Sequence, residues 1–180
     1  MVYVLLAEGF EEVEALTPVD LLRRSKVETK IVGVTGMAVT GSHGITVQAD
    51  ISIEDITDWS AADMIVLPGG MPGTLNLEKS EYVQKAIDYC VQNNRYIGAI
   101  CAAPSILGHK GLLKGKKAVC YTGFEAQLEG AEIINAPVAV DGNIITARGA
   151  GAAVKFGLAL VEMAVSKAES DRQFKAILCD

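Results

Sequence analysis

Short apolar runs alternate with amphipathic stretches along most of this chain, and that alternation limits its fold more than any other feature. The apolar runs predict buried strands, and the stretches between them have the spacing of apolar residues that is typical of helices. Strands that alternate with helices favour a mostly parallel sheet with helices on both faces. We therefore predict the α/β fold class. The chain shows no internal repeat or linker, and its 180 residues suit one domain spanning 1–180.

The predicted elements follow one another with few gaps. Strands are predicted at Val2–Ala7, Thr29–Val34, Asp63–Leu67, Tyr96–Ile100, Lys117–Tyr121, Ala131–Ile134 and Asn143–Ala147. Helices are predicted at Glu11–Ser25, Glu81–Asn93, Ala102–His109, Phe124–Leu128 and Gly149–Ser166, with one further turn after Lys167. Met37–Val47 is rich in turn formers and is expected to form a small hairpin or an irregular excursion.

Composition and charge argue against several classes of protein. The formal net charge is -6, so the chain lacks the basic footprint of a nucleic-acid binder. No apolar stretch reaches the roughly 20 residues that a membrane-spanning helix needs. The first residues carry no basic leader of the kind found in signal peptides. We expect a cytoplasmic protein with neither nucleic acid nor membrane as a partner.

The four cysteines are too scattered for a disulfide framework or a zinc site. Cys90 and Cys120 lie on apolar faces of predicted elements and are expected in the core, whereas Cys179 lies in the tail. The two histidines are too few for a histidine-based metal site. We therefore expect neither a metal nor an organic cofactor.

Three segments that carry chemical groups lie at the predicted carboxyl ends of strands. They are Glu8–Glu14, Pro68–Gly73 and Ile100–Pro104. In open α/β sheets, ligands bind at the carboxyl ends of the strands. We expect the fold to bring these three segments together.

Cys101 stands between a predicted buried strand and a predicted helix. Its neighbours Ala99, Ala102 and Ala103 are small, as a tight strand-to-helix turn requires. Such an elbow exposes the side chain and strains the backbone, as in other nucleophile elbows. Free N–H groups at the helix start would favour the thiolate, so the pKa of Cys101 is expected to fall. The alternative is a small buried core thiol.

Gly69 and Gly70 follow a predicted strand and offer backbone N–H groups close to the predicted elbow. Together with the N–H of Ala102, they would form an oxyanion hole for a substrate oxygen. The alternative is an ordinary glycine turn.

Four acidic residues crowd the segment after the first strand: Glu8, Glu11, Glu12 and Glu14. Most of them suit the first turn of a helix, where the helix dipole stabilises acids. One that faced the pocket would act as a general acid or base with a raised pKa. Spacing alone does not choose which one.

The histidines argue against a peptidase or amidotransferase. Such enzymes pair the cysteine with a nearby histidine. Some cysteine enzymes of this architecture carry that histidine directly after the nucleophile, but the residue there is Ala102 in this chain. His109 lies at the far end of the short helix, and His43 reaches the pocket only if the excursion folds over it.

Several of these segments resemble the DJ-1/ThiJ/PfpI superfamily, and specifically its DJ-1-like branch (the Parkinson disease protein 7-like proteins). They lie in the right order across nearly the whole chain: Ala7–Glu14 (AEGFEEVE), Pro18–Asp20 (PVD), Val66–Gly70 (VLPGG), Ala99–Pro104 (AICAAP) and Thr146–Gly149 (TARG). The resemblance implies a flavodoxin-like fold and a homodimer. It also implies that Cys101 is an oxidation-prone nucleophile, that Glu14 hydrogen-bonds its thiol, and that Gly70 and Ala102 supply the N–H donors.

The chain departs from the pattern of the superfamily at three places. Thr122 stands nearest to the position where many members carry a histidine, and His43 replaces an arginine of the excursion. We nevertheless expect Gly69, His43 and Thr122 to contribute to substrate binding. The usual Arg-Gly-Pro-Gly-Thr becomes Arg-Gly-Ala-Gly-Ala at Arg148–Ala152, which predicts a less rigid loop.

The resemblance implies several functions. The first is a glyoxalase or deglycase activity on methylglyoxal and glyoxal that protects against carbonyl and oxidative stress. The second is a redox sensor or chaperone that works through oxidation of Cys101. The branch also carries a ThiJ-type label for thiazole monophosphate biosynthesis, for which these residues offer little mechanistic basis.

Overall fold

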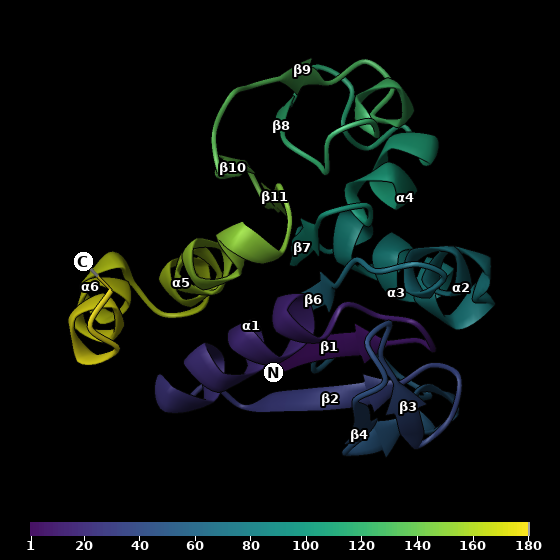
Figure 1. The fold of residues 1–180 in the computed structure, drawn as a ribbon. Helices are drawn as coiled ribbons and strands as arrows, with labels where there is room; N and C mark the ends of the chain where they lie inside the picture. The colour runs from purple at the N-terminus through teal and green to yellow at the C-terminus, as the bar shows by residue number, and fades with distance from the viewer. Residues whose placement is uncertain (180) are drawn as a thin grey trace.

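Seven strands form the central sheet of the computed structural model, which describes residues 1–179 (Figure 1). In chain order they are β1 (Val2–Leu6), β2 (Thr29–Gly33), β5 (Ile51–Ser52), β6 (Met64–Leu67), β7 (Tyr96–Ile100), β10 (Val138–Asp141) and β11 (Ile144–Ala147). Their order across the sheet is β10-β11-β7-β6-β1-β2-β5. All neighbouring pairs are parallel except β10 and β11. The predicted α/β class with a mostly parallel sheet is confirmed.

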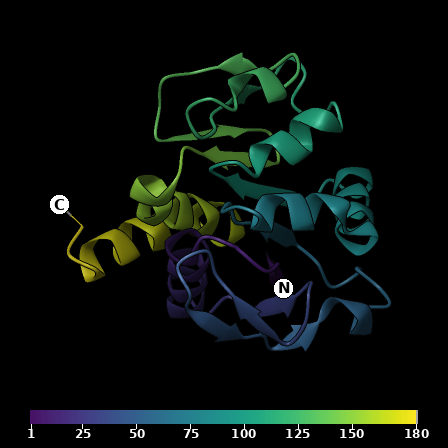
Figure 2. The same cartoon turned by 45° about the vertical axis from the view of Figure 1, so that its right-hand side comes forward.

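Helices cover both faces of this sheet (Figures 1 and 2). On one side lie α1 (Glu12–Arg24) and α5 (Ala153–Ala164), with α6 (Lys167–Ala176) packed against α5. On the other side lie α2 (Gly73–Lys79), α3 (Glu81–Gln92) and α4 (Pro104–His109). The helices shield both faces of the central strands from water. Side chains on both faces of these strands are therefore apolar, and the strands appear in the sequence as continuous apolar runs.

Two apolar clusters hold these layers together. Along β1, Val2, Val4 and Leu6 join the cluster that contains α1 and α5, whereas Tyr3 and Leu5 join the cluster that contains α3. Successive side chains of a strand point to opposite faces of its sheet, so a fully apolar strand feeds both clusters.

The predicted hairpin is present. β3 (Ala38–Thr40) and β4 (Thr46–Gln48) pair antiparallel and form a separate two-stranded sheet. It lies beyond β2, at the edge of the molecule opposite β8 and β9 (Figure 1).

Other sequence-based predictions for the second half of the chain were wrong. β8 (Lys117–Ala118) and β9 (Glu132–Ile133) are shorter than predicted and pair with each other instead of joining the central sheet. β10 was not predicted, because its apolar residues Val138–Val140 are only three and follow directly after a proline. The predicted helix at Phe124–Leu128 is one 3-10 turn, Glu125–Gln127.

The helix predictions also need corrections. α2 was not predicted, because it is short and opens with glycine. α5 begins at Ala153, after a 3-10 turn at Ala150–Ala152. The tail forms a full helix, α6, instead of one turn. Ser166 caps it by accepting a hydrogen bond from the Glu169 N–H at 3.2 Å.

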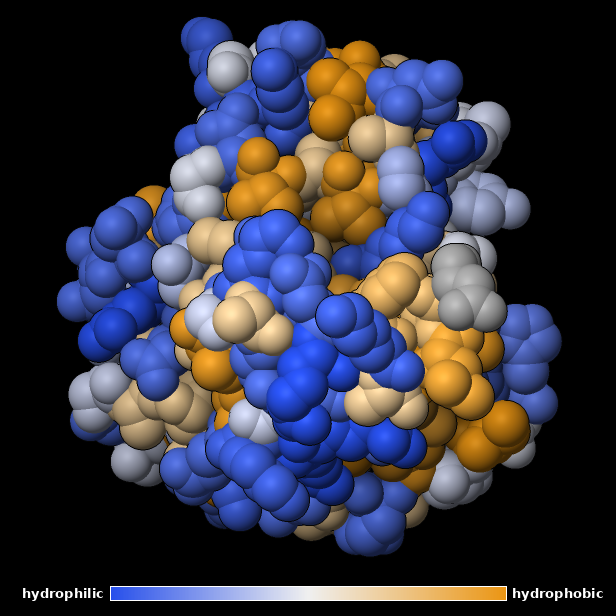
Figure 3. Space-filling view, turned by 90° about the vertical axis from the view of Figure 1, so that its left-hand side faces the viewer, coloured by the Kyte–Doolittle hydropathy of each residue, from blue (hydrophilic) through white to orange (hydrophobic). Residues whose placement is uncertain are grey.

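Apolar side chains also reach the surface on the side of α6. Figure 3 views that side and shows hydrophobic side chains gathered in patches between hydrophilic ones. Val165 just after α5, Phe174 in α6 and Leu178 just after α6 are exposed by 50%, 39% and 84%. Within residues 1–179, no helix combines the length and the apolar character needed to span a membrane.

The close packing of α5 on β7 makes a stability prediction. A Cβ at Gly98 of β7 would lie 2.8 Å from Leu160 Cδ2 and 3.1 Å from the Phe156 ring. Overpacking of this kind costs about 1–3 kcal/mol, so Gly98→Val should lower the free energy of unfolding by that amount in urea titrations. Gly151→Ala is the control, because its Cβ meets no atom within 4 Å. A Gly98→Val protein as stable as the wild type would contradict this packing.

Candidate active site

The three chemically interesting segments come together at the carboxyl ends of the strands, as predicted. The Glu11 N–H donates to the Gly69 carbonyl at 2.9 Å, and the Gly73 N–H donates to the Gly9 carbonyl at 3.1 Å. These bonds join the segment after β1 to the segment after β6. Cys101 follows β7, which pairs with β6.

Cys101 occupies the strained elbow that the sequence predicts. Its φ angle is 67°, a left-handed conformation that few residues other than glycine adopt. Its N–H donates to the Ala147 carbonyl at 2.9 Å, and its carbonyl accepts from the Tyr121 N–H at 2.7 Å. Strain of this kind costs about 1–3 kcal/mol and persists only where the surroundings hold the backbone in place. Here two neighbouring segments hold it.

Gly69 allows Glu14 and Cys101 to approach each other. A Cβ at Gly69 would lie 2.5 Å from Glu14 Oε2 and 2.6 Å from the Cys101 Cβ, so no other residue fits there. The Gly69 N–H donates to Glu14 Oε2 at 3.0 Å. This N–H is therefore occupied in holding the carboxyl group, and it is not free for the substrate-binding role expected of it.

Glu14, Gly70 and Ala102 all lie against the Cys101 sulfur. The Glu14 carboxyl shares a hydrogen bond with the thiol, and the backbone N–H groups of Gly70 and Ala102 also point to it. Of the four acidic residues after β1, Glu14 is thus the one beside the sulfur. It is also 1% exposed.

The electrostatics of this pair differ from the sequence-based expectation. Burial, the charge of Glu14 and its hydrogen bond raise the pKa of Cys101 to about 12, against the lowering effect of the Ala102 and Gly70 N–H groups. The expected fall in this pKa is therefore wrong. α4 is a short helix that begins only at Pro104, and its N–H groups do not outweigh burial and a neighbouring carboxylate.

The pKa of Glu14 is shifted as well, and this shift matters for chemistry near neutral pH. Burial raises the pKa of Glu14 to about 7, although hydrogen bonds from Cys101 and Gly69 lower it. Near pH 7 the side chain is therefore both a proton donor and a proton acceptor. When it is protonated, its negative charge is gone and its O–H can donate to a thiolate.

A cavity of about 380 Å³ opens onto the sulfur of Cys101. Its lining combines the two acids Glu11 and Glu14 with hairpin, loop and elbow residues: Ser42, His43, Gly70, Met71, Cys101, Ala102, Tyr121, Phe124 and Ala150. Thr122 lines a neighbouring cavity instead of this one. Thr122 is exposed and does not occupy the place in the substrate pocket of Cys101 that was predicted for it.

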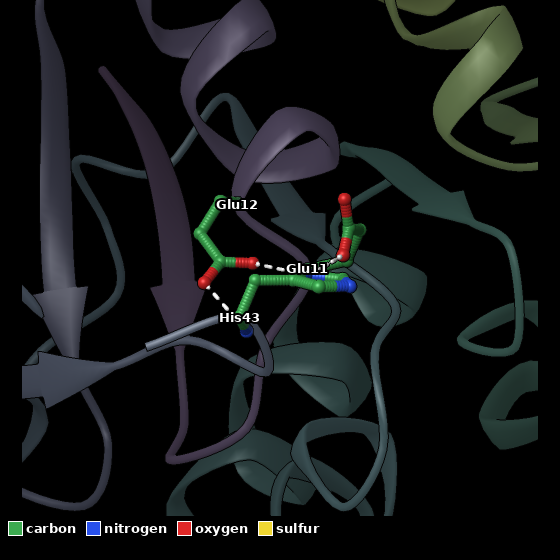
Figure 4. A group of neighbouring side chains, drawn as sticks. All are labelled: Glu11, Glu12 and His43. Atoms are coloured by element: carbon green, nitrogen blue, oxygen red, sulfur yellow. Dashed lines mark hydrogen bonds and ion pairs between the residues drawn. The ribbon is translucent and has the colours of Figure 1, made fainter. Parts of the chain in front are cut away.

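The hairpin does fold over this pocket, and Glu12 is the residue that anchors it. Figure 4 shows Glu11 and Glu12 on either side of the His43 ring. Glu12 Oε1 accepts from the N–H groups of His43 at 2.8 Å and Ile45 at 3.3 Å, and Oε2 lies 3.0 Å from His43 Nδ1. Glu11 Oε2 lies 3.1 Å from the same Nδ1.

These contacts suit an anchor better than a metal ligand set. Both oxygens of Glu12 are occupied by hydrogen bonds, and the carboxyl is buried. Burial raises the pKa of Glu12, but hydrogen bonds from its own backbone and from His43 and Ile45 outweigh it and lower the pKa. The hydrogen bond to Glu12 and the charges of both acids raise the pKa of His43.

The other candidate residues lie away from the sulfur. His109 Nδ1 pairs with Glu78 Oε1 at 2.6 Å, at the far end of α4 as expected. Cys90 and Cys120 are buried, as expected, and Cys179 is partly exposed. The cavity is also lined by five residues that were not predicted to line it: Ser42, Met71, Tyr121, Phe124 and Ala150. The sequence carried a signal for three of them, because Met71 lies in the predicted segment Pro68–Gly73, Ser42 in the predicted excursion and Ala150 in the Arg-Gly-Ala-Gly-Ala loop.

The raised pKa of Glu14 predicts an unusual dependence of stability on pH. A carboxyl whose pKa is raised on folding stabilises the protein below its unfolded pKa and loses this contribution as the pH rises through the folded value. The window therefore runs from pH 4.5 to about 7. At about 1.4 kcal/mol per pKa unit, the loss is on the order of 3 kcal/mol.

Glu14→Gln should remove this loss. Urea unfolding at several pH values across the window measures the free energy of unfolding of both proteins. As the pH rises through the window, the free energy of unfolding of the variant should increase relative to that of the wild type by about 3 kcal/mol. Parallel curves for the two proteins would show that the pKa of Glu14 is not raised.

Comparisons with known proteins agree with this fold. The model of the DJ-1/PfpI family matches residues 1–163. A Parkinson disease protein 7 homolog from Danio rerio is 34% identical over 97% of this chain and 94% of its own length. A deglycase from Thermococcus kodakarensis is 32% identical over 83% of this chain and 90% of its own length.

Protein DJ-1 homolog B from Arabidopsis thaliana is 38% identical over 92% of this chain, but the chain spans only 38% of that longer protein. Among solved structures, oxidized Toxoplasma gondii DJ-1 superposes with a TM-score of 0.93 at 32% identity, covering 98% of this chain and 97% of that one. The flavodoxin-like arrangement of the sheet and helices matches this structure and that of Drosophila melanogaster DJ-1beta, which also has a TM-score of 0.93. This chain belongs to the DJ-1/PfpI family.

Proposed function

We propose that the chain is a cysteine-dependent enzyme of the glyoxalase or deglycase type that acts on small 2-oxoaldehydes such as methylglyoxal and glyoxal. One observation carries the proposal: the Cys101 thiol and the Glu14 carboxyl share a hydrogen bond at the floor of a cavity of about 380 Å³. A nucleophile beside a group that both gives and takes protons is what addition to an aldehyde requires. The Thermococcus relative, whose name is deglycase, supports the same class.

The reaction begins with addition to the carbonyl. Glu14 as carboxylate takes the thiol proton, and the sulfur attacks the aldehyde carbon of methylglyoxal, forming a C–S bond. The N–H groups of Gly70 and Ala102, which point to the sulfur, would stabilise the oxyanion. Protonation of that oxygen by Glu14 gives a hemithioacetal.

The second half is an internal oxidation and reduction. Glu14 removes the proton from the former aldehyde carbon and returns it to the neighbouring ketone carbon, through an enediol. The aldehyde carbon is thereby oxidised to a thioester, and the ketone is reduced to an alcohol. Water then cleaves the C–S bond, which releases lactate and restores the thiol. The sum is methylglyoxal plus water to lactate, with no outside oxidant.

His43 stands at the rim of the cavity, where it suits substrate binding better than proton transfer at the sulfur. Its ring is tied to Glu11 and Glu12. Among residues 1–179, the group hydrogen-bonded to the sulfur through a side chain is Glu14 alone. The proton shuttle is therefore assigned to Glu14. Protection against carbonyl stress in the cytoplasm is the cellular role that we propose for this activity.

The same sulfur supports a second candidate function, a redox sensor. Peroxide would convert Cys101 to a sulfinic acid, whose oxygens suit the N–H groups of Gly70 and Ala102 and the O–H of a protonated Glu14. One relative of known structure, Toxoplasma gondii DJ-1, is described in an oxidized form.

Lactate formation from methylglyoxal by the purified protein tests the enzyme proposal. Cys101→Ser should abolish it, and Glu14→Gln should lower the turnover number by about 10²- to 10⁴-fold because general acid–base catalysis is lost. Cys179→Ser, in the tail, is the matched control and should leave turnover unchanged. No lactate from folded wild type would refute the activity on this substrate. Selective gain of two oxygens on Cys101 after mild peroxide would then favour the redox sensor.

We also propose a homodimer, which the family favours. Apolar side chains exposed by about half lie beside the pocket, where Val13 is 48% and Ile45 is 54% exposed. Both adjoin Glu12, since Val13 is its neighbour in α1 and the Ile45 N–H donates to it. Pairing two copies would remove this surface from water. Sedimentation equilibrium of the wild type should give twice the mass of one chain. The Ile45→Glu variant should give a mass closer to that of a single chain. A wild-type protein with the mass of a single chain would refute the dimer.

A further inference from the structure

A second and larger cavity lies beside the one at Cys101. Its volume is about 600 Å³, which is within the range of small-molecule sites. It lies between the start of α5, the segment before β10 and the loop after Tyr121, and it is lined by Tyr121, Thr122, Asn135, Ala136, Pro137, Arg148, Gly149, Ala150, Gly151, Ala152 and Lys155. Tyr121 and Ala150 line both cavities.

The charge of this second cavity is positive. Its two charged residues are Arg148 and Lys155, and none of its lining residues is acidic. Neither cation forms an ion pair within residues 1–179. Glu125 lines an adjoining hollow with Arg148, but its carboxylate accepts from the Gly123 N–H at 2.7 Å. In a chain with net charge -6, a pocket with two unpaired cations and no acid is set apart from its surroundings.

Neutral donors complement the two cations. The Thr122 hydroxyl and the Asn135 amide also line the cavity. The remaining lining is apolar or backbone, notably Ala136, Pro137 and Ala152. The lining therefore offers charged and neutral donors to an oxyanion and apolar contacts to a carbon chain.

The two cavities have opposite charge and share a wall. The cavity at Cys101 contains Glu11 and Glu14, which disfavour an anion near the sulfur. Gly149 stands in the wall, where a Cβ would lie 3.4 Å from the Tyr121 ring and 3.9 Å from the Cys101 sulfur. Arg148 precedes Gly149 in the chain, and both residues line the positive cavity.

We propose that this second cavity is an anion subsite that takes a phosphate or carboxylate group of a small organic ligand. Arg148 and Lys155 supply the charge, and Thr122 and Asn135 supply neutral hydrogen bonds. The consequence for the substrate rests on the proposed function. If Cys101 is the nucleophile of that enzyme, the preferred substrate is a carbonyl compound with an anionic group at its other end, instead of methylglyoxal itself. The carbonyl would lie at Cys101 and the anion at Arg148 and Lys155.

A titration with inorganic phosphate tests the subsite without any turnover. The protein carries Cys101→Ser, so that failure of the proposed enzyme activity has no effect on the result. Chloride keeps the ionic strength constant while amide signals are followed by NMR. We expect saturable shifts that are confined to residues 121–122, 135–136 and 148–155. In this background, Arg148→Gln and Lys155→Gln should each weaken binding by roughly tenfold, since each removes a charged hydrogen-bond donor.

Lys175→Gln is the matched control. Lys175 is an exposed lysine on α6 with no ion pair within residues 1–179, and its loss should leave the phosphate affinity unchanged. If Arg148→Gln disturbs the spectrum as a whole, the exposed Lys155→Gln variant decides. A parallel titration with acetate separates the two anions, because shifts with acetate as well as phosphate indicate a carboxylate subsite and shifts with phosphate alone indicate a phosphate subsite. The proposal would be overturned if phosphate caused no saturable shift. It would also be overturned if phosphate bound equally well to the Cys101→Ser protein with and without Lys155→Gln.

Discussion

The contact between Glu14, Gly69 and Cys101 is the constraint on which the active-site region depends. It places a carboxyl and a thiol together in a buried position, where desolvation penalises the charge of either group. The pair is tolerated because the Gly69 N–H holds the carboxyl and because Gly69 has no Cβ to separate the two side chains. The same burial gives Glu14 a pKa of about 7, which is the property that the proposed chemistry uses.

Backbone hydrogen bonds hold the surroundings of this contact in place. The segment after β1 is bonded to Gly69, and the elbow at Cys101 is bonded to Ala147 and to Tyr121. The hairpin is held on the opposite side by the buried carboxylate of Glu12. As a result, a cysteine with φ of 67° stays at the floor of a cavity whose rim comes from a distant part of the chain. Rigid surroundings of this kind are what preorganised catalysis requires.

Two features of the molecule depend on long-range neighbours that no local pattern displays. The first is the pKa of Cys101, which burial and Glu14 raise although the local turn suggested a fall. The second is the division of the site into an acidic cavity and a basic one, with Tyr121 and Ala150 between them. Thr122 belongs to the basic side, which its position after a predicted strand did not indicate.

The sequence by itself determined the α/β class, the positions of β1, β2, β6, β7 and β11, and the elbow at Cys101. Those follow from local causes: continuous apolar runs make buried strands, and small residues around Cys101 permit a tight turn. It also placed Cys90 and Cys120 in the core. Spacing left open which of four neighbouring acids meets the sulfur, and the resemblance to the superfamily already implied Glu14. Only the tertiary structure decided that the Gly69 N–H is occupied by that acid and where β8 and β9 pair. The reason is physical, because these outcomes depend on which surfaces the folded chain brings together and removes from water, and spacing along the chain does not encode that.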